Sequence, residues 1–397
     1  MLKRSYVLLI LMSLVLTFFV SCEEAEETDP CNPVDVAGEL EEVAFRFLFT
    51  PEQVEQQLSM FGAPIGITLT HTVDTYRITY KTRDKDGDLV SASGLMAVPP
   101  GVDTLDVISV QHGTVVQRDR VGSVNPVFSM DALLFAMNGY LALAPDYLGL
   151  GQSETIHPYL HAELTANAVV DLIRAARAYA CQNDLVFNDD IFLAGYSEGG
   201  YATLASQREI ETHYADEIQL KAVVPMSGPY DLLGSTRNLL SRESYAVPAF
   251  FGYVVVAYND VYGWDRLGDI FQDPYADQLP GLFDGTLDIG TINADLPTRI
   301  DEFFEAGFVE GIMNGSETEI LAALEENTLL DWSPVAPILL THGTADSTVS
   351  YANSETTLAA LSANGAEISL LPIQGADHIG GFFPSVLLAK AWFDELR

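Results

Sequence analysis

Short apolar runs alternate with helical stretches over most of this 397-residue chain, and this pattern limits the folds that it can adopt. The runs are nearly continuous, as in strands buried on both faces of a parallel sheet. They lie at residues 106–113, 140–147, 190–197, 220–228, 336–343 and 367–375. Before them, the alternating segments 74–82 and 89–99 predict an antiparallel hairpin, and an amphipathic helix is predicted at 163–181. We therefore predict an α/β fold with a mostly parallel central sheet flanked by helices.

One long interval, residues 229–334, breaks this alternation. It separates two apolar runs that a short crossover could join, and a structureless loop of that length is implausible. It contains an aromatic-rich stretch, 245–264, and a helical stretch, 296–308. We predict that the globular domain spans 41–397 and that this interval is a largely helical cap over the carboxyl edge of the sheet. The alternative is an extra subdomain without a role at that edge.

The N-terminus is typical of an export signal. Lys3 and Arg4 precede the apolar stretch 7–20, which is too short to span a bilayer comfortably. A small residue directly before Cys22 resembles the cleavage site of bacterial lipoproteins, in which that cysteine carries the lipid. We predict a signal peptide at 1–21, an acidic tether at 22–40, and an exported protein anchored through Cys22 to the outer membrane or the cell surface. A plainly secreted protein is the alternative.

Cysteine usage agrees with export. Once Cys22 is set aside, Cys31 and Cys181 remain as a single pair. In an oxidising compartment a disulfide between them would tie the tether to the predicted helix 163–181. Two free buried thiols are the alternative interpretation.

The charge of the chain excludes one class of partner. There are 56 acidic and 19 basic residues, for a formal net charge of −37. Nucleic acid binding requires clustered Lys and Arg, so it is not expected, and peripheral binding to anionic lipid is also disfavoured. An acidic, well-solvated surface in an extracellular or salty setting fits this composition.

The segment FLAGYSEGGYATL, residues 192–204, carries the strongest chemical signal. Ser197 follows an apolar strand, precedes a helical pattern, and lies between Gly195 and Gly199. The sequence G-x-S-x-G in this context predicts a nucleophile elbow, a sharp turn that exposes a serine hydroxyl at the end of a strand. Gly200 adds a further small residue to that turn. A serine hydroxyl is a weak nucleophile unless a base and an acid assist it.

Two later strands supply those partners. Asp346 lies in a loop after the run 336–343, and His378 lies in a loop after the run 367–375. Ligands bind at the carboxyl ends of strands in open α/β sheets, and the chain order Ser, acid, His is that of α/β-hydrolases. Asp377 is a rival acid, but a residue adjacent to the histidine rarely reaches its Nδ1. We predict the catalytic residues Ser197, Asp346 and His378.

A tetrahedral intermediate at this serine would need two backbone donors. We predict the amide of Glu198 and, from the loop 111–114, that of Thr114 with Gly113 as the alternative. His112 is interpreted as a residue that holds this loop. His157 and His161 have a spacing that can bind zinc on a helix, but no third ligand is evident. They are interpreted as structural, and no metal or organic cofactor is predicted.

These motifs resemble a known family. QHGT, APDYLGLG, HPYLHAE, GYSEGG, MSGPYDL, HGTAD and DH occur in the order seen in α/β-hydrolases that look like secretory lipases, from about residue 74 onward. The resemblance implies a serine carboxylic ester hydrolase, an esterase or lipase, with a cap that shapes the acyl pocket and a small-molecule or lipid ester as substrate. The triad that it implies is Ser197, Asp346 and His378.

Two other functions stay open from the sequence. A peptidase of prolyl-oligopeptidase-like type shares these motifs but usually carries a large propeller before the hydrolase domain. Fewer than eighty residues precede the first predicted strand here. A non-catalytic binding lipoprotein on a hydrolase fold is the third hypothesis, because fold does not dictate function.

Overall fold

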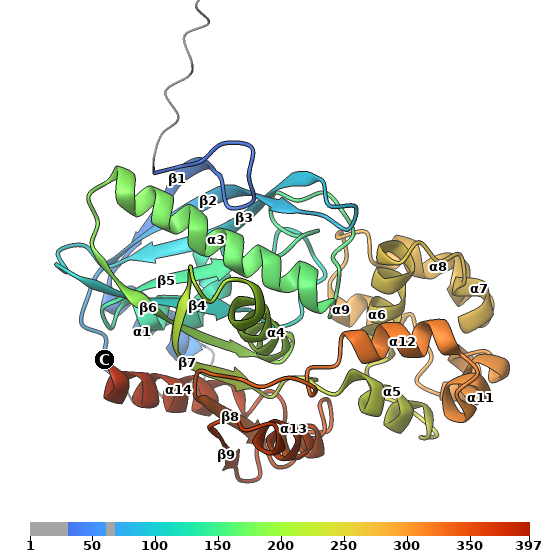
Figure 1. Cartoon of the computed structure of the whole chain (residues 1–397). Helices are drawn as coiled ribbons and strands as arrows, with labels where there is room; N and C mark the ends of the chain where they lie inside the picture. Colours follow the sequence, from blue (N-terminus) through green and yellow to red (C-terminus); the bar gives the residue numbers. More distant parts are fainter. Residues whose placement is uncertain (1–30, 61–67) are drawn as a thin grey trace, which may run out of the picture.

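The computed structural model describes residues 31–60 and 68–397. Within these residues a nine-stranded sheet has the order β1-β2-β3-β5-β4-β6-β7-β8-β9 (Figure 1). The strands are β1 (Leu40–Phe49), β2 (Val73–Arg83), β3 (Leu89–Val98), β4 (Leu105–Gln111), β5 (Tyr140–Pro145), β6 (Phe187–Tyr196), β7 (Gln219–Met226), β8 (Ile338–Gly343) and β9 (Ile368–Ile373). Pairing is antiparallel from β1 through β3 to β5 and parallel from β5 through β4 to β9. The predicted α/β class is therefore confirmed.

The continuous apolar runs arise because the central strands are buried on both faces. Along β5, Leu141 and Leu143 join the core that contains α3 (Ala162–Gln182), whereas Tyr140, Ala142 and Ala144 join the core that contains α2 (Met130–Ala136) and α14 (Phe382–Leu396). Figure 1 shows α3 and α4 (Glu198–His213) along one side of the sheet and α14 along the other. The helices outside the long interval are α1 (Pro51–Met60), α2 (Met130–Ala136), α3 (Ala162–Gln182), α4 (Glu198–His213), α13 (Tyr351–Ala363) and α14 (Phe382–Leu396), with a 3₁₀ turn at Pro126–Ser129.

The sequence did not predict β1 or α1. Strand β1 lies at the edge of the sheet, and Phe45, Phe47 and Leu48 are each about half exposed. A strand whose apolar residues face water on both sides lacks the regular alternation that marks a half-buried strand. The register shift between Phe45 and Phe47 disturbs its period further.

The described chain is attached to the domain from its first residue. Cys31 and Cys181 form a disulfide with sulfur atoms 1.95 Å apart, which joins the N-terminal segment to the end of α3. The amide of Gly38 donates to the Lys81 carbonyl at 2.8 Å. Residues 31–39, assigned to the tether from sequence, therefore lie against the domain. The predicted signal peptide and Cys22 are outside the described residues. In the ranges 31–60 and 68–397, no helix is both long and apolar enough to cross a bilayer.

Between β7 and β8 the chain forms a group of helices that stands beside the sheet (Figure 1). These are α5 (Leu232–Leu240), α6 (Pro248–Val261), α7 (Leu267–Ile270), α8 (Tyr275–Leu282), α9 (Ile289–Ala294), α10 (Ile300–Phe303), α11 (Ala306–Asn314) and α12 (Thr318–Glu326). The helix expected over 296–308 is split. Phe304 and Glu305 are extended, and Phe304 pairs with Phe271 in an isolated β-bridge.

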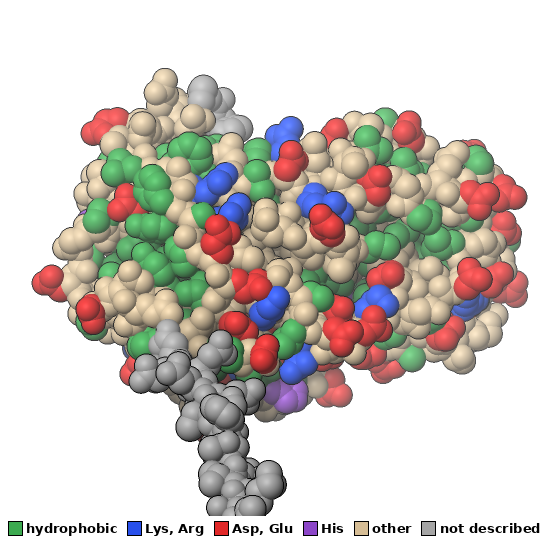
Figure 2. Space-filling view, turned by 90° about the horizontal axis from the view of Figure 1, so that it is seen from above, with side chains coloured by type: hydrophobic (Ala, Val, Ile, Leu, Met, Phe, Trp, Pro, Cys, Tyr) green, Lys and Arg blue, Asp and Glu red, His purple; other side chains and the backbone are tan. Residues whose placement is uncertain are grey.

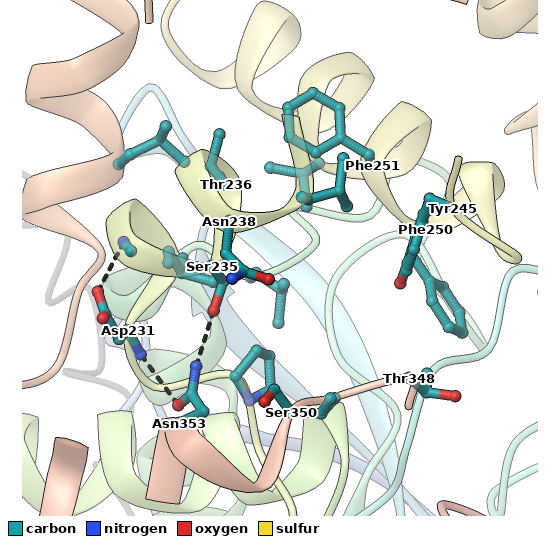
Figure 3. A pocket seen from close by; sticks show the side chains of 18 of the residues that line it. Asp231, Ser235, Thr236, Asn238, Tyr245, Phe250, Phe251, Thr348, Ser350 and Asn353 are labelled. Carbon is teal, nitrogen blue, oxygen red and sulfur yellow. Dashed lines mark hydrogen bonds between the residues drawn. The ribbon is translucent and has the colours of Figure 1, made fainter. Parts of the chain in front are cut away.

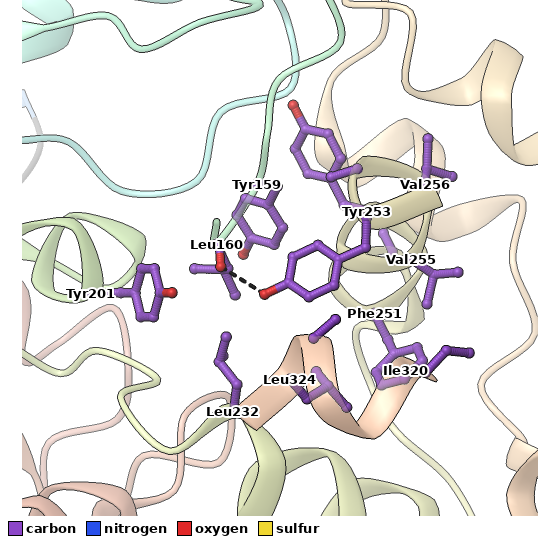
Figure 4. Packing of buried hydrophobic residues seen from close by; sticks show 14 of the residues in the cluster. Tyr159, Leu160, Tyr201, Leu232, Phe251, Tyr253, Val255, Val256, Ile320 and Leu324 are labelled. Atoms are coloured by element: carbon purple, nitrogen blue, oxygen red, sulfur yellow. Dashed lines mark hydrogen bonds between the residues drawn. The ribbon is translucent and has the colours of Figure 1, made fainter. Parts of the chain in front are cut away.

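An apolar core attaches this helical group to the rest of the molecule. Tyr159, Leu160 and Tyr201 pack against side chains of α6 and α12, as Figure 4 shows. The Tyr258 hydroxyl donates to the Leu160 carbonyl at 2.9 Å, and the Tyr201 hydroxyl donates to the Asn327 carbonyl at 2.8 Å. The helical group is thus fixed against α4, the helix that follows Ser197.

The surface reflects the acidic composition. On the face in Figure 2, acidic side chains are spread between apolar and neutral ones, and the fewer Lys and Arg side chains lie among them. The described residues on this face form no basic cluster. Dispersed carboxylates of this kind are hydrated and screened by salt.

Candidate active site

Ser197 lies at the sharp turn between β6 and α4. Its backbone has φ 62° and ψ −121°, a conformation that non-glycine residues rarely adopt. A Cβ atom on Gly195 would collide with the Gly199 carbonyl, and one on Gly199 would collide with the Gln111 carbonyl. The two glycines therefore allow the turn to pack against the end of β4. This strand–turn–helix context agrees with the one that the sequence predicted.

Three side chains from distant parts of the chain meet here. The Nε2 atom of His378 lies 2.9 Å from the Ser197 Oγ, and its Nδ1 lies 2.6 Å from the Asp346 Oδ2. A carboxylate only accepts hydrogen bonds, so Nδ1 carries the proton and Nε2 presents its lone pair to the serine. The rival Asp377 instead accepts the amide of Gly380 at 2.7 Å.

The Asp346 carboxylate is held by donors on both oxygens. The amides of Thr348 and Val349 each donate to Oδ1 at 2.9 Å. The Nε2 of His342 lies 3.3 Å from Oδ2 and 3.0 Å from the Val349 carbonyl, which fixes a proton on that nitrogen. Burial by itself would raise the pKa of Asp346. The hydrogen bonds from His342 and His378 outweigh it and lower the pKa to about 2. The group is therefore ionised at neutral pH.

Sequence reasoning did not assign this contact to His342. The residue is buried on β8, four positions before Asp346, and its Nδ1 lies 2.7 Å from the Ser354 Oγ. The HGTAD motif contained the signal, because a histidine at a strand end and an acid in the following loop lie close together. Its contact with the carboxylate is visible only in the structure, where Ser354 of α13 contacts the other ring nitrogen and so orients the ring.

Of the predicted oxyanion donors, Glu198 follows the serine directly and Gly113 packs against it. Gly113 packs so closely that a Cβ there would lie 3.2 Å from the Tyr196 carbonyl and 3.6 Å from the Ser197 Cβ. Within the described chain, no hydrogen bond occupies the amides of Gly113, Thr114 and Glu198. The Thr114 hydroxyl contacts the Tyr159 hydroxyl at 2.9 Å. The geometry leaves both Thr114 and Gly113 as candidates.

The histidines interpreted as structural have separate environments. His112 contacts the carbonyls of Gly113 and Asp146, at 2.8 and 3.2 Å, as expected for a residue that holds its loop. His161 caps α3, and burial lowers its pKa to about 4. His157 lies 2.7 Å from the Glu198 carboxyl. Among the described residues, no three His, Cys, Asp or Glu side chains form a group that could hold a metal.

A cavity of about 270 Å³ opens at Ser197 and Glu198. It lies between the sheet domain and the helical group, so both parts supply its walls. Figure 3 shows the polar side, where the Asn353 amide donates to the Ser235 hydroxyl at 2.7 Å. The apolar side comes from α6 and α12 and includes Phe250, Phe251, Val254 and Leu324. A substrate that reaches the serine would therefore contact both a polar and an apolar wall.

Comparison with protein families gives two matches. The model of the secretory lipase family matches residues 127–262, and that of the prolyl oligopeptidase family matches residues 304–387. The first range contains Ser197, and the second contains Asp346 and His378. No curated protein sequence matches this chain.

Solved structures resemble the chain over most of its length. The rice cell wall degrading esterase LipA from Xanthomonas oryzae is 28% identical with a TM-score of 0.81, covering 91% of this chain and 100% of that one. A Legionella pneumophila protein provisionally described as a hydrolase is 28% identical with a TM-score of 0.83, covering 90% and 98%. Candida antarctica lipase A is 17% identical with a TM-score of 0.67, covering 91% and 83%, and shares the fold.

The lowered pKa of Asp346 predicts a pH-dependent contribution to stability. Because its pKa in the folded state, about 2, is below the ordinary value of 3.8, the carboxylate stabilises the fold above about pH 4. This contribution is lost as the pH falls toward 2. We expect the difference in unfolding free energy between wild type and Asp346→Asn, measured with urea, to be largest near neutral pH. It should shrink steadily between about pH 4 and pH 2.

The matched control is Asp377→Asn, an isosteric change in the neighbouring loop. Comparing each variant with wild type at the same pH cancels the titration of the many surface carboxylates. A difference for Asp346→Asn that stays constant down to pH 2 would contradict the lowered pKa.

Proposed function

We propose that this chain, a carboxylic ester hydrolase with the α/β-hydrolase fold, cleaves its substrate through an acyl-enzyme intermediate on Ser197. The observation that carries the proposal is the 2.9 Å contact between the Ser197 Oγ and the His378 Nε2. On the other side of the ring, the Asp346 carboxylate binds Nδ1 at 2.6 Å. A hydroxyl, an imidazole with its free nitrogen toward it, and a buried carboxylate are the groups that nucleophilic acyl transfer requires.

In the proposed reaction, the Ser197 oxygen attacks the ester carbonyl carbon while His378 Nε2 accepts the hydroxyl proton. The imidazolium that forms is stabilised by the Asp346 carboxylate. His378 then donates the proton to the leaving alcohol, and the acyl group remains on the serine. Water attacks this acyl group with His378 as base, which releases the acid and restores the hydroxyl. No step in this sequence requires a cofactor.

The oxygen of the ester carbonyl becomes negatively charged during each attack. We propose the Glu198 amide as one donor to this oxyanion, because it begins α4 directly after the nucleophile. The second donor is the Thr114 amide, with that of Gly113 as the alternative. Support comes from the position of Glu198 directly after Ser197, from the close packing of Gly113 against Ser197, and from the absence of another hydrogen bond on these amides among the described residues. The helix N-terminus adds a favourable partial charge at this place.

The role of Ser197 is tested by Ser197→Ala with nitrophenyl esters. We expect kcat to fall by at least about 10⁴-fold, because the nucleophile is removed, while Ser241→Ala on the exposed end of α5 stays at the wild-type rate. A fluorophosphonate probe should label wild type and Ser241→Ala and leave Ser197→Ala unlabelled. Equal ester hydrolysis by wild type and Ser197→Ala would refute the mechanism.

The same assay separates the other two functions. The match of residues 304–387 to the prolyl oligopeptidase family favours a peptidase as the second candidate. Faster turnover of peptide than of ester substrates by wild type, abolished in Ser197→Ala, would select that candidate. A wild-type protein that neither hydrolyses esters nor reacts with the probe would instead be a non-catalytic binding protein.

We further propose that the cavity beside Ser197 receives the acyl chain against the apolar side chains of α6 and α12. Val254 lines this wall, so Val254→Trp would fill part of the cavity. We expect kcat/KM for an octanoyl ester to fall at least about tenfold, because the displaced methylenes lose their contacts, and that for an acetyl ester to change less than about threefold.

The matched control is Val335→Trp, which places the same side chain at a position that is 81% exposed. It should leave both esters unaffected. An equal loss for octanoyl and acetyl esters in Val254→Trp would show that the acyl chain does not occupy this wall.

We propose that the protein is exported and anchored through a lipid on Cys22. The support is the N-terminal sequence and the description of the matching family as secretory. In a Gram-negative bacterium grown with radioactive palmitate, wild type should be labelled and Cys22→Ser should lose the label. Cys31→Ser is the control and should keep it. Wild type without label would leave plain secretion as the explanation.

A further inference from the structure

The side chain of Glu198 points away from solvent into a buried contact with His157. Both side chains are 1% exposed, and the His157 Nε2 lies 2.7 Å from the Glu198 Oε1. The proposed mechanism uses only the backbone amide of Glu198. The carboxyl and the imidazole beside it are therefore titratable groups at the nucleophile to which the triad gives no role.

The contacts of the pair determine where its protons lie. His157 Nδ1 lies 2.8 Å from the Leu148 carbonyl, which only accepts, so Nδ1 carries a proton. A neutral imidazole with its proton on Nδ1 would present a lone pair at Nε2. Opposite an ionised Glu198, two lone pairs would then face each other at 2.7 Å, which is repulsive. A second proton must therefore lie between Nε2 and Oε1, and the pair as a whole carries no net charge.

The surroundings make a net charge on this pair costly. The ring of Tyr147 stacks on His157 with centroids 5.7 Å apart, and Tyr253 of α6 packs at 5.6 Å. Glu198 Oε2 is buried and accepts no hydrogen bond from any described residue, so within the described chain His157 is the partner that compensates a charge on this carboxyl. The guanidinium of Arg118 is directed to the carbonyls of Gly149 and Asp284 rather than to this carboxyl.

We propose that His157, by sharing a proton with the Glu198 carboxyl, keeps the pair neutral as a unit beside the oxyanion, and that it positions the first amide of α4. His157 is thus a positioning residue that acts through Glu198. The inference rests on the proposed function, because the oxyanion forms only if Ser197 attacks a carbonyl. Glu198 carries both the carboxyl and the proposed donor amide, so a charge on the carboxyl lies within a few bonds of that amide.

The expected effect is specific to the transition state. A lone carboxylate at position 198 would repel the oxyanion, which is absent in the ground state, so kcat should fall while KM changes little. In His157→Gln the amide can bind the carboxyl but cannot supply the shared proton. We expect kcat for nitrophenyl acetate to fall about 10- to 100-fold, less than the roughly 10²- to 10³-fold cost of losing a whole oxyanion donor.

The decisive comparison adds Glu198→Gln to His157→Gln. If the defect of the single variant is an uncompensated negative charge, the double variant, which is neutral, should recover most of the lost kcat. The matched control is His213→Gln. His213 contacts Glu209 at 3.1 Å on the exposed side of the same helix, so that change should leave kcat at the wild-type value. Rates are normalised to sites that react with the fluorophosphonate probe, so that unfolded molecules do not count.

Two outcomes overturn the inference: wild-type kcat in His157→Gln, or a double variant no faster than the single one. If His157→Gln does not accumulate as folded protein, the same comparison is made on the yield of probe-reactive enzyme. Rescue by Glu198→Gln supports the proposal, and failure to rescue overturns it.

Ser197→Ala in the same assay distinguishes a failure of the proposed function from a failure of the role of His157. If it hydrolyses esters like wild type, the proposed function fails, whereas an inactive Ser197→Ala with a fully active His157→Gln refutes only the role of His157.

Discussion

The proposed chemistry depends on the hydrogen bond between the Asp346 carboxylate and His378. It fixes the proton on Nδ1 of the ring and so leaves the Nε2 lone pair toward Ser197. The carboxylate can serve this purpose because two amides of its own loop hold Oδ1, while His342 contacts Oδ2 beside His378. Parallel pairing of β8 and β9 sets the spacing, since the loops that carry the acid and the base leave neighbouring strands at the same edge.

The nucleophile depends on a different constraint, which is steric. Ser197 has a positive φ, and the turn is possible because glycines on either side of the serine allow the backbone of α4 to approach β4. The same turn ends at Glu198, the first residue of α4. The helical group between β7 and β8 borders the cavity that opens at Ser197. Its α6 and α12 supply the apolar cavity wall, and its core is continuous with Tyr201 on α4.

The contact between His157 and Glu198 connects these two parts. The imidazole packs against Tyr253 of α6, and the carboxyl belongs to the residue that follows the nucleophile. In a chain with a net charge of −37, most carboxylates face water, where hydration and salt screen them. Glu198 is buried, so solvent does not screen a charge on its carboxyl. A partner that shares a proton with this carboxyl therefore changes the electrostatic potential at the site more than a surface ion pair would.

The sequence by itself determined the sheet from β2 to β9, the turn at the serine and the candidates Ser197, Asp346 and His378. These features are local: the apolar period, the flanking glycines and the position of a polar residue after a strand can all be read within short segments. It did not reveal β1, whose exposed edge position obscures its alternation, or the break at Phe304 that an isolated bridge imposes. Only the tertiary structure decided which polar side chains meet. The contacts of His342 with Asp346 and of His157 with Glu198 depend on how loops and helices pack, and no local pattern encodes that packing.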